Sequence, residues 1–175
     1  MNFLELTSYI GGPQGYADRP EFSDDVWPLL MRKRTEIEGV FLFRNDRSRS
    51  LGWAGEYAVV SENIVRIRPM DQLTEHEIDK LKHWSFYGGH LNVLYRVSSE
   101  SSLLRELCNL YPTIHHSSDD VEPLGLDEEF LPELRVFTAA SPSLHLSFAH
   151  DGDPLYVFGE LEALRELLRN VNRPH

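Results

Sequence analysis

The densest group of side chains able to do chemistry lies in one short polar stretch. His115 and His116 are followed, after two serines, by Asp119 and Asp120. Imidazoles and carboxylates bind divalent transition ions, and a histidine beside an acid can also act as a general base. Adjacent residues point in different directions, however, and acid-rich loops are often only solvated. A small metal-assisted hydrolase using these four residues is therefore an alternative interpretation, and the main one assigns no metal, no cofactor and no catalytic residue.

The charge distribution gives a second candidate site, and it suits binding better than catalysis. Residues 119–133 contain seven acids and no base, whereas residues 32–68 contain eight arginines and lysines against five acids. Charge runs are often only solvated faces, but an acidic patch can also steer a basic partner into place. We call residues 119–130 the acidic segment. Its predicted binding residues are Asp119, Asp120, Glu122, Asp127, Glu128, Glu129 and Phe130.

Several catalytic signatures are incomplete. His76-Glu77 begins a zinc-protease helix motif, but that motif needs a second histidine four residues after the first, and Lys80 stands there. His83 lies two turns from His76, roughly 10 Å along a helix, which is too far for one ion. The glycine-rich stretch 11–15 is not followed by Gly-Lys-Ser/Thr, and no Gly-x-Ser-x-Gly elbow occurs.

The remaining histidines and the single cysteine have plain structural interpretations. His145 and His150 fall on opposite faces of a predicted strand, so they cannot easily share a metal. Cys108 falls on the apolar face of a predicted helix, an environment that raises the pKa of a thiol and makes it inert.

Hydrophobic periodicity predicts the elements that position these residues. Thr74 and Glu77 have the spacing of a capping box, so a helix is predicted over 74–84. Residues 113–133 are polar and predict a long loop with a helical turn near 127–131. Further helices are predicted from about residue 25, over 99–111 and over 160–171, giving about four in all. Strands are predicted over 3–10, 40–43, 56–60, 63–68, 92–97, 134–138, 144–150 and 155–158.

Hairpins mixed with helices favour an α+β fold with a mixed, mostly antiparallel sheet. The strand–strand–helix order occurs at 56–84 and again at 144–171, which raises the hypothesis of a duplicated ββα unit. Specific residues are expected to be buried in the core of this fold. They are Ile78, Leu81, Val93, Tyr95, Val97, Leu103, Leu104 and Leu107.

Length and composition limit the class of protein. With 175 residues and 41% apolar residues, the chain is predicted to form a single globular domain. A net charge of −11 argues against direct nucleic-acid binding. The N-terminus lacks the features of a secretory signal, no apolar run is long enough for a membrane span, and one cysteine cannot form an internal disulfide. A cytoplasmic protein is predicted.

Three functional hypotheses remain open. The first is a non-enzymatic protein-binding module whose acidic surface engages a basic partner; bacterial immunity proteins, which neutralise basic toxin domains, often have this size and acidity. The second is the metal-assisted hydrolase described above. The third is a structural subunit that forms oligomers, with Trp27, Trp53 and Trp84 in a core or an interface. The sequence does not specify an oligomeric state.

Overall fold

The computed structural model describes residues 2–8, 20–44, 57–87, 91–118, 131–139, 143–149 and 152–171. The acidic segment therefore lies outside the described residues. The strands are β1 (Asn2–Thr7), β2 (Ile37–Arg44), β3 (Ile64–Arg66), β4 (Leu91–Val97), β5 (Thr113–Ser118), β6 (Leu144–Phe148) and β7 (Leu155–Phe158). The α-helices are α1 (Trp27–Arg32), α2 (Glu75–Tyr87), α3 (Ser102–Leu110), α4 (Leu131–Ala139) and α5 (Leu161–Val171).

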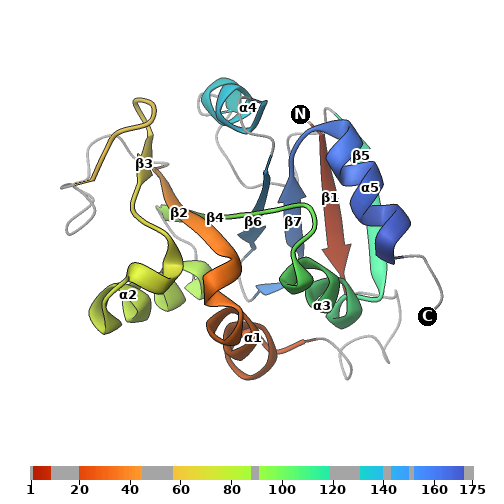
Figure 1. Ribbon diagram of the computed structural model, residues 1–175, viewed down its shortest axis with the longest axis horizontal. Coiled ribbons are helices and arrows are strands. Elements are labelled where there is room, and N and C mark those ends of the chain that lie inside the picture. Colours follow the sequence, from red (N-terminus) through yellow and green to blue (C-terminus); the bar gives the residue numbers. More distant parts are fainter. Residues whose placement is uncertain are drawn as a thin grey trace.

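All seven strands belong to one sheet in the order β3-β2-β4-β6-β7-β1-β5 (Figure 1). Every pairing between neighbouring strands is antiparallel. The prediction of an α+β fold with a largely antiparallel sheet is confirmed. The sheet joins distant parts of the chain, because β1 lies between β7 and β5.

The helices are unevenly shared between the two faces of the sheet. α1, α2, α3 and α5 cover one face and build the main core, in which the strand residues Leu4, Tyr95 and Val157 are buried with helix residues such as Leu104 and Leu164. α4 lies apart from the other helices on the opposite face (Figure 1). There Leu134 is buried in a smaller core with Phe3, Phe41, Phe43, Ile64, Leu94, Tyr156 and Phe158. We call this second surface the α4 face.

Alternation along the strands explains this division. In β4, Val93, Tyr95 and Val97 point into the main core, as predicted, while Leu94 between them points to the α4 face. In α3, the predicted apolar stripe of Leu103, Leu104, Leu107 and Cys108 is buried, and Ser101 caps the helix by accepting from the Leu103 backbone N–H.

The predicted capping box at α2 is confirmed and is part of a larger network. The Glu77 carboxylate accepts hydrogen bonds from Thr74 N at 2.8 Å and from Thr74 Oγ1 at 2.9 Å. Tyr57 and Arg68 also contact this carboxylate. Burial acts to raise the pKa of Glu77, but these hydrogen bonds and the arginine charge lower it overall. The helix runs three residues beyond the predicted end, to Tyr87.

Two predicted elements are wrong. Residues 113–118 are a strand rather than a loop, because β5 pairs with β1 along its whole length, and an edge strand can carry polar side chains. Residues 134–138 are helical rather than extended, which brings the α-helices among the described residues to five. Leu134, Phe137 and Thr138 recur at helical spacing and bury one side of α4, whereas Val136 is exposed.

The ββα duplication receives little support from the strand pairing. β6 and β7 form a full antiparallel hairpin that leads into α5. In the first unit, β3 is three residues long and pairs with β2, and the predicted strand over 56–60 is represented by a single bridge between Val59 and Val65. None of the described helices has the length and apolarity that crossing a membrane requires.

Candidate functional site

The predicted binding residues connect two described elements. Asp119, Asp120, Glu122, Asp127, Glu128, Glu129 and Phe130 all belong to the acidic segment, outside the part of the chain that the structure describes. The segment joins the end of β5 at Ser118 to the start of α4 at Leu131. β5 is the last strand at one edge of the sheet, and α4 covers the α4 face, so both of its attachment points are known.

The two predicted metal ligands within the described chain do not converge. His115 and His116 are adjacent on β5, and both are exposed. Because successive side chains of a strand point to opposite faces, one ion cannot easily bind both imidazoles. Asp119 and Asp120 lie outside the described residues, and among those described no group of three histidine, cysteine or acidic side chains is placed to hold a metal.

A different set of polar residues is brought together by the strand register. Glu5 on β1 is paired with His115 on β5 and, on its other side, with Tyr156 on β7. Tyr156 in turn is paired with Ser147 on β6. Directly paired residues share a face, with Cβ atoms about 5 Å apart. His115, Glu5, Tyr156 and Ser147 therefore form one row across four neighbouring strands, which we call the polar row.

The polar row leads into a pocket beside α4. Its last two residues, Tyr156 and Ser147, line a small pocket with room for about one water molecule, together with Phe43, Asn92, Leu94, Leu134 and Phe158. Leu134 belongs to α4, and the other residues belong to β2, β4, β6 and β7. Most of the wall is apolar, and the polar groups are an amide, an alcohol and a phenol. Small-molecule sites enclose roughly 300–1,000 Å³, so this pocket is too small for such a ligand.

The electrostatic environment of the polar row is negative. The pKa of Tyr156 is raised to about 12. Burial is the largest cause, and the negative charges of Glu5 and Asp153 raise the pKa further. The phenol therefore stays neutral at physiological pH and can donate a hydrogen bond. Glu5 is half-buried, and no hydrogen bond or ion pair within the described part of the chain engages its carboxylate.

The geometry of the row fits binding better than nucleophilic catalysis. His115 and Ser147 lie at opposite ends, three strand spacings or roughly 14 Å apart. A serine nucleophile needs its general base within hydrogen-bond reach, about 3 Å. His115 therefore cannot activate Ser147. Cys108 is not a nucleophile either, because burial raises the pKa of its thiol to about 12, as its place on the apolar face of α3 predicted.

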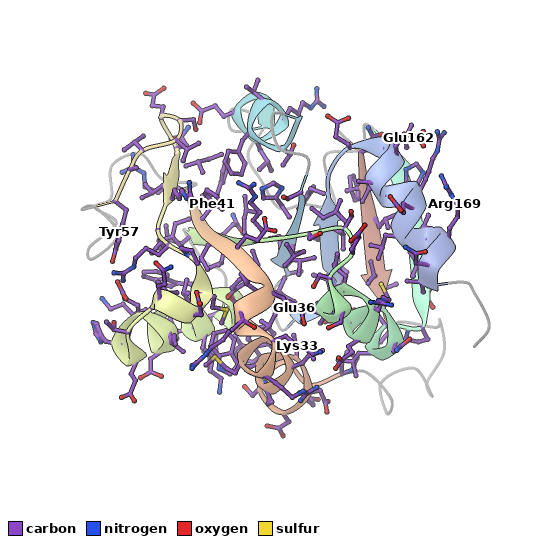
Figure 2. All side chains as sticks on the ribbon, in the orientation of Figure 1. Lys33, Glu36, Phe41, Tyr57, Glu162 and Arg169 are labelled. Atoms are coloured by element: carbon purple, nitrogen blue, oxygen red, sulfur yellow. The ribbon has the colours of Figure 1, made fainter. Side chains whose placement is uncertain are left out.

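Several basic residues of the 32–68 stretch form ion pairs with acids of the same chain. Lys33 lies 2.9 Å from Glu106 and 3.5 Å from Glu36, and Arg32 lies 3.0 Å from Glu106. Figure 2 shows Lys33 and Glu36 together near α1. The ion pair between Arg68 and Glu77 completes α2. At these positions the predicted positive charge of the stretch is balanced by glutamates of the same chain.

Those histidine and tryptophan residues from the sequence analysis that the structure describes here are packed in or against the two cores. His145 lies on the α4 face, fully buried between the rings of Phe41 and Phe137. Trp27 is buried, and Trp84 packs half-buried against the main core. Neither indole is an exposed interface residue. His150 and Trp53 lie outside the described residues.

The polar row was missed because its signal is not local. Each member is one polar position in an alternating strand, and only the pairing of β1 with both β5 and β7 brings them together. No protein-family model matches the sequence, and no curated protein or solved structure shows significant similarity to it. The site must therefore be interpreted from its own chemistry.

Proposed function

We propose that this chain is a non-enzymatic, cytoplasmic protein-binding module that engages a basic protein partner. The acidic segment and the adjoining α4 face form its binding surface. Inhibition of a basic partner, in the manner of an immunity protein, is the form of this function that we favour. The surplus of 28 acids over 17 bases makes direct binding of nucleic acid unfavourable, since phosphates need a basic surface.

One observation supports this function above the others: many exposed acids of the described residues have no ion pair. Arg32, Lys33 and Arg68 form ion pairs within the fold. In contrast, six exposed acids have no ion pair within the described residues: Asp24, Asp71, Asp79, Glu100, Glu160 and Glu166. A partner therefore meets a surface whose negative charge is free to act at a distance.

The test separates the acidic segment from general negative charge. In one variant, Asp119, Asp120 and Asp127 become Asn, and Glu122, Glu128 and Glu129 become Gln. The control variant neutralises the six exposed acids named above in the same way, so that both variants lose six charges. Each protein is immobilised and used to capture partners from a lysate of the source organism at about 50 and 500 mM salt, where exposed charges are respectively weakly and strongly screened.

We expect the wild type and the control variant to retain the same basic protein at low salt and the segment variant to lose it. Partners are identified by mass spectrometry, and the retained protein is then purified and titrated against each variant. Equal binding by all three proteins, or equal loss in both variants, would contradict the assignment to the acidic segment. Capture of the chain's own copies alone, with a doubled solution mass, would favour the oligomer-forming hypothesis instead.

A further inference from the structure

We propose that α4 is a cover that acid releases: when His145 on β6 takes up a proton, α4 leaves the sheet while the main core stays folded. This behaviour follows from the way α4 packs and does not depend on the proposed function. Three features of the α4 face support it. They are the limited attachment of α4, the polar atoms that it buries, and the surroundings of His145.

α4 is attached to the sheet by a small set of contacts. Leu134 and Phe137 supply its apolar contacts to the smaller core. In its first turn, Glu133 accepts hydrogen bonds from Ser61 Oγ at 3.1 Å and from the Asn63 backbone N–H at 3.2 Å. Among the described α-helices, α4 alone has no extensive backbone contact with another element. A helix held in this way opens at a lower free energy than the helices of the main core.

The packing of α4 also leaves polar atoms buried without partners. Asn63, which is bonded to Glu133, has a side chain that is 1% exposed, and His145, which packs on Phe137, is fully buried. Neither polar atom of the Asn63 amide and neither ring nitrogen of His145 has a hydrogen-bond partner among the described residues. Burial removes the hydration of such atoms without replacing it. Release of α4 lets water reach them again.

His145 is the one of these two groups that responds to mild acid, because the ordinary pKa of an imidazole is close to neutrality. Its ring lies 5.0 Å from the ring of Phe137 on α4 and 6.1 Å from that of Phe41 on β2, measured between centroids. Phe158 on β7 is its cross-strand neighbour on one side. An imidazolium has two N–H donors and none of these rings is a strong acceptor, so the charged form needs water.

The charged neighbour of His145 does not replace that water. Arg96 on β4 is the cross-strand neighbour on the other side, and its charge adds to burial in lowering the pKa of His145 to about 4. The Glu38 carboxylate on β2 is already engaged, by Arg96 at 3.4 Å and by Ser143 at 3.3 Å. The remaining titratable groups on the elements packed around His145 are Arg44 on β2, Tyr156 on β7, and Glu133 and Arg135 on α4. None of them forms a hydrogen bond with His145.

The test measures hydrogen exchange at single amides of the full chain by NMR, at pH 7.0 and pH 5.0. Rates are expressed as protection factors, which correct for the intrinsic exchange rate at each pH. At pH 5.0 most carboxylates stay charged, since they titrate near pH 4. The variant His145→Phe keeps an aromatic ring beside Phe137 but binds no proton. The control His76→Phe makes the same exchange at an exposed position of α2, on the opposite face of the sheet.

In the wild type we expect the amides of α4 to be at least about tenfold less protected than those of α3 and α5, because α4 opens without the main core. Between pH 7.0 and pH 5.0 the protection of α4 should fall about 20-fold in the wild type and in His76→Phe. This ratio follows from a pKa of 6.5 in the released state and about 4 beneath α4. In His145→Phe the protection of α4 should change by less than about threefold over the same range.

A second variant removes the cover directly. Phe137→Ala should leave the amides of α4 unprotected already at pH 7.0, while α3 and α5 keep their protection. An NMR titration of the His145 ring in this variant should show protonation near the ordinary pKa of 6.5, since water then reaches the imidazole.

Three results would each overturn the proposal. The first is equal protection of α4 and α5 at both pH values, which would mean that α4 opens only when the whole chain unfolds. The second is a fall in the protection of α4 in His145→Phe as large as in the wild type. The third is a His145 ring that stays unprotonated at pH 5.0 in Phe137→Ala. None of these results bears on the capture of a basic partner, so the proposed function is tested separately.

Discussion

His145 gives the sharpest prediction, because a fold that buries an imidazole without hydrogen bonds must lose stability in acid. Its side chain is fully buried on the α4 face, 5.0 Å from the Phe137 ring and 6.1 Å from the Phe41 ring, measured between ring centroids. Neither ring nitrogen has a hydrogen-bond partner among the residues that the structure describes. Burial first, and then the neighbouring charge of Arg96, lower the pKa of His145 from 6.5 to about 4.

The sign and size of the effect follow from proton linkage. Between pH 6.5 and about 4, His145 is protonated in the unfolded chain but not in the folded chain, so acid favours unfolding in this window. This difference in pKa lowers the free energy of unfolding by about 3 kcal/mol once both states are protonated. Between pH 7 and pH 4.5 the loss is about 2 to 3 kcal/mol. Arg96 on β4 is the direct cross-strand neighbour of His145 on β6, and it is itself paired with Glu38 on β2 at 3.4 Å.

The assay compares urea unfolding of the wild type and His145→Phe at several values between pH 7.5 and 4.5. Phenylalanine keeps an aromatic ring between Phe41 and Phe137 but cannot bind a proton. We expect the free energy of unfolding to fall with acid more steeply in the wild type, by about 2 kcal/mol over this range, than in the variant. The reasoning is refuted if both proteins lose the same stability, since the acid sensitivity would then arise elsewhere.

Three further predictions concern the described residues. Glu36 accepts hydrogen bonds from Ser101 and Ser102; although burial opposes it, these bonds and Lys33 lower its pKa to about 2. Glu36→Gln should therefore destabilise the fold by about 2 kcal/mol near neutrality, measured by urea unfolding, and the difference should shrink as pH falls from 4.5 towards 2. Gly152→Ala should lower the free energy of unfolding by about 1–3 kcal/mol in the same assay. The φ of Gly152 is +80°, and the new Cβ would lie 2.8 Å from Phe22. A melting temperature within one degree of the wild type would contradict this. Cys108 should resist a thiol reagent at pH 8 in native protein and react fully in denaturant, and rapid native labelling would refute its burial in the core.

Local patterns predicted most of the fold. The capping box at Thr74, the apolar stripe of α3 and the alternation of β4 each depend on residues close in sequence, and each is confirmed. The errors occur where local patterns were ambiguous. In residues 134–138 the spacing of Leu134, Val136 and Thr138 fits a strand, but Phe137 packs on Phe41 and Val136 is exposed, which only a helix allows.

The candidate site could not be predicted in the same way. Glu5 and Tyr156 are paired although they lie at opposite ends of the chain, and nothing near either residue indicates its partner. His115 was selected from the sequence for its neighbours in a supposed loop, yet its place beside Glu5 depends on β5 being a strand. Register across a sheet is set by the whole set of buried faces, so a polar row appears only when the strand order is known.

The uneven cover of the sheet explains why polar residues persist on the α4 face. Four helices bury the opposite face, whereas α4, nine residues long, packs over part of this one through Leu134 and Phe137. Beneath α4 the strands carry Phe41, Leu94 and Phe158; beside it they carry Ser147, Glu5 and His115. A sheet buried on both faces has no room for an unpaired carboxylate, because burial without a partner is costly. Because Glu5 is only half-buried, its carboxylate stays hydrated at the part of the α4 face that α4 leaves uncovered.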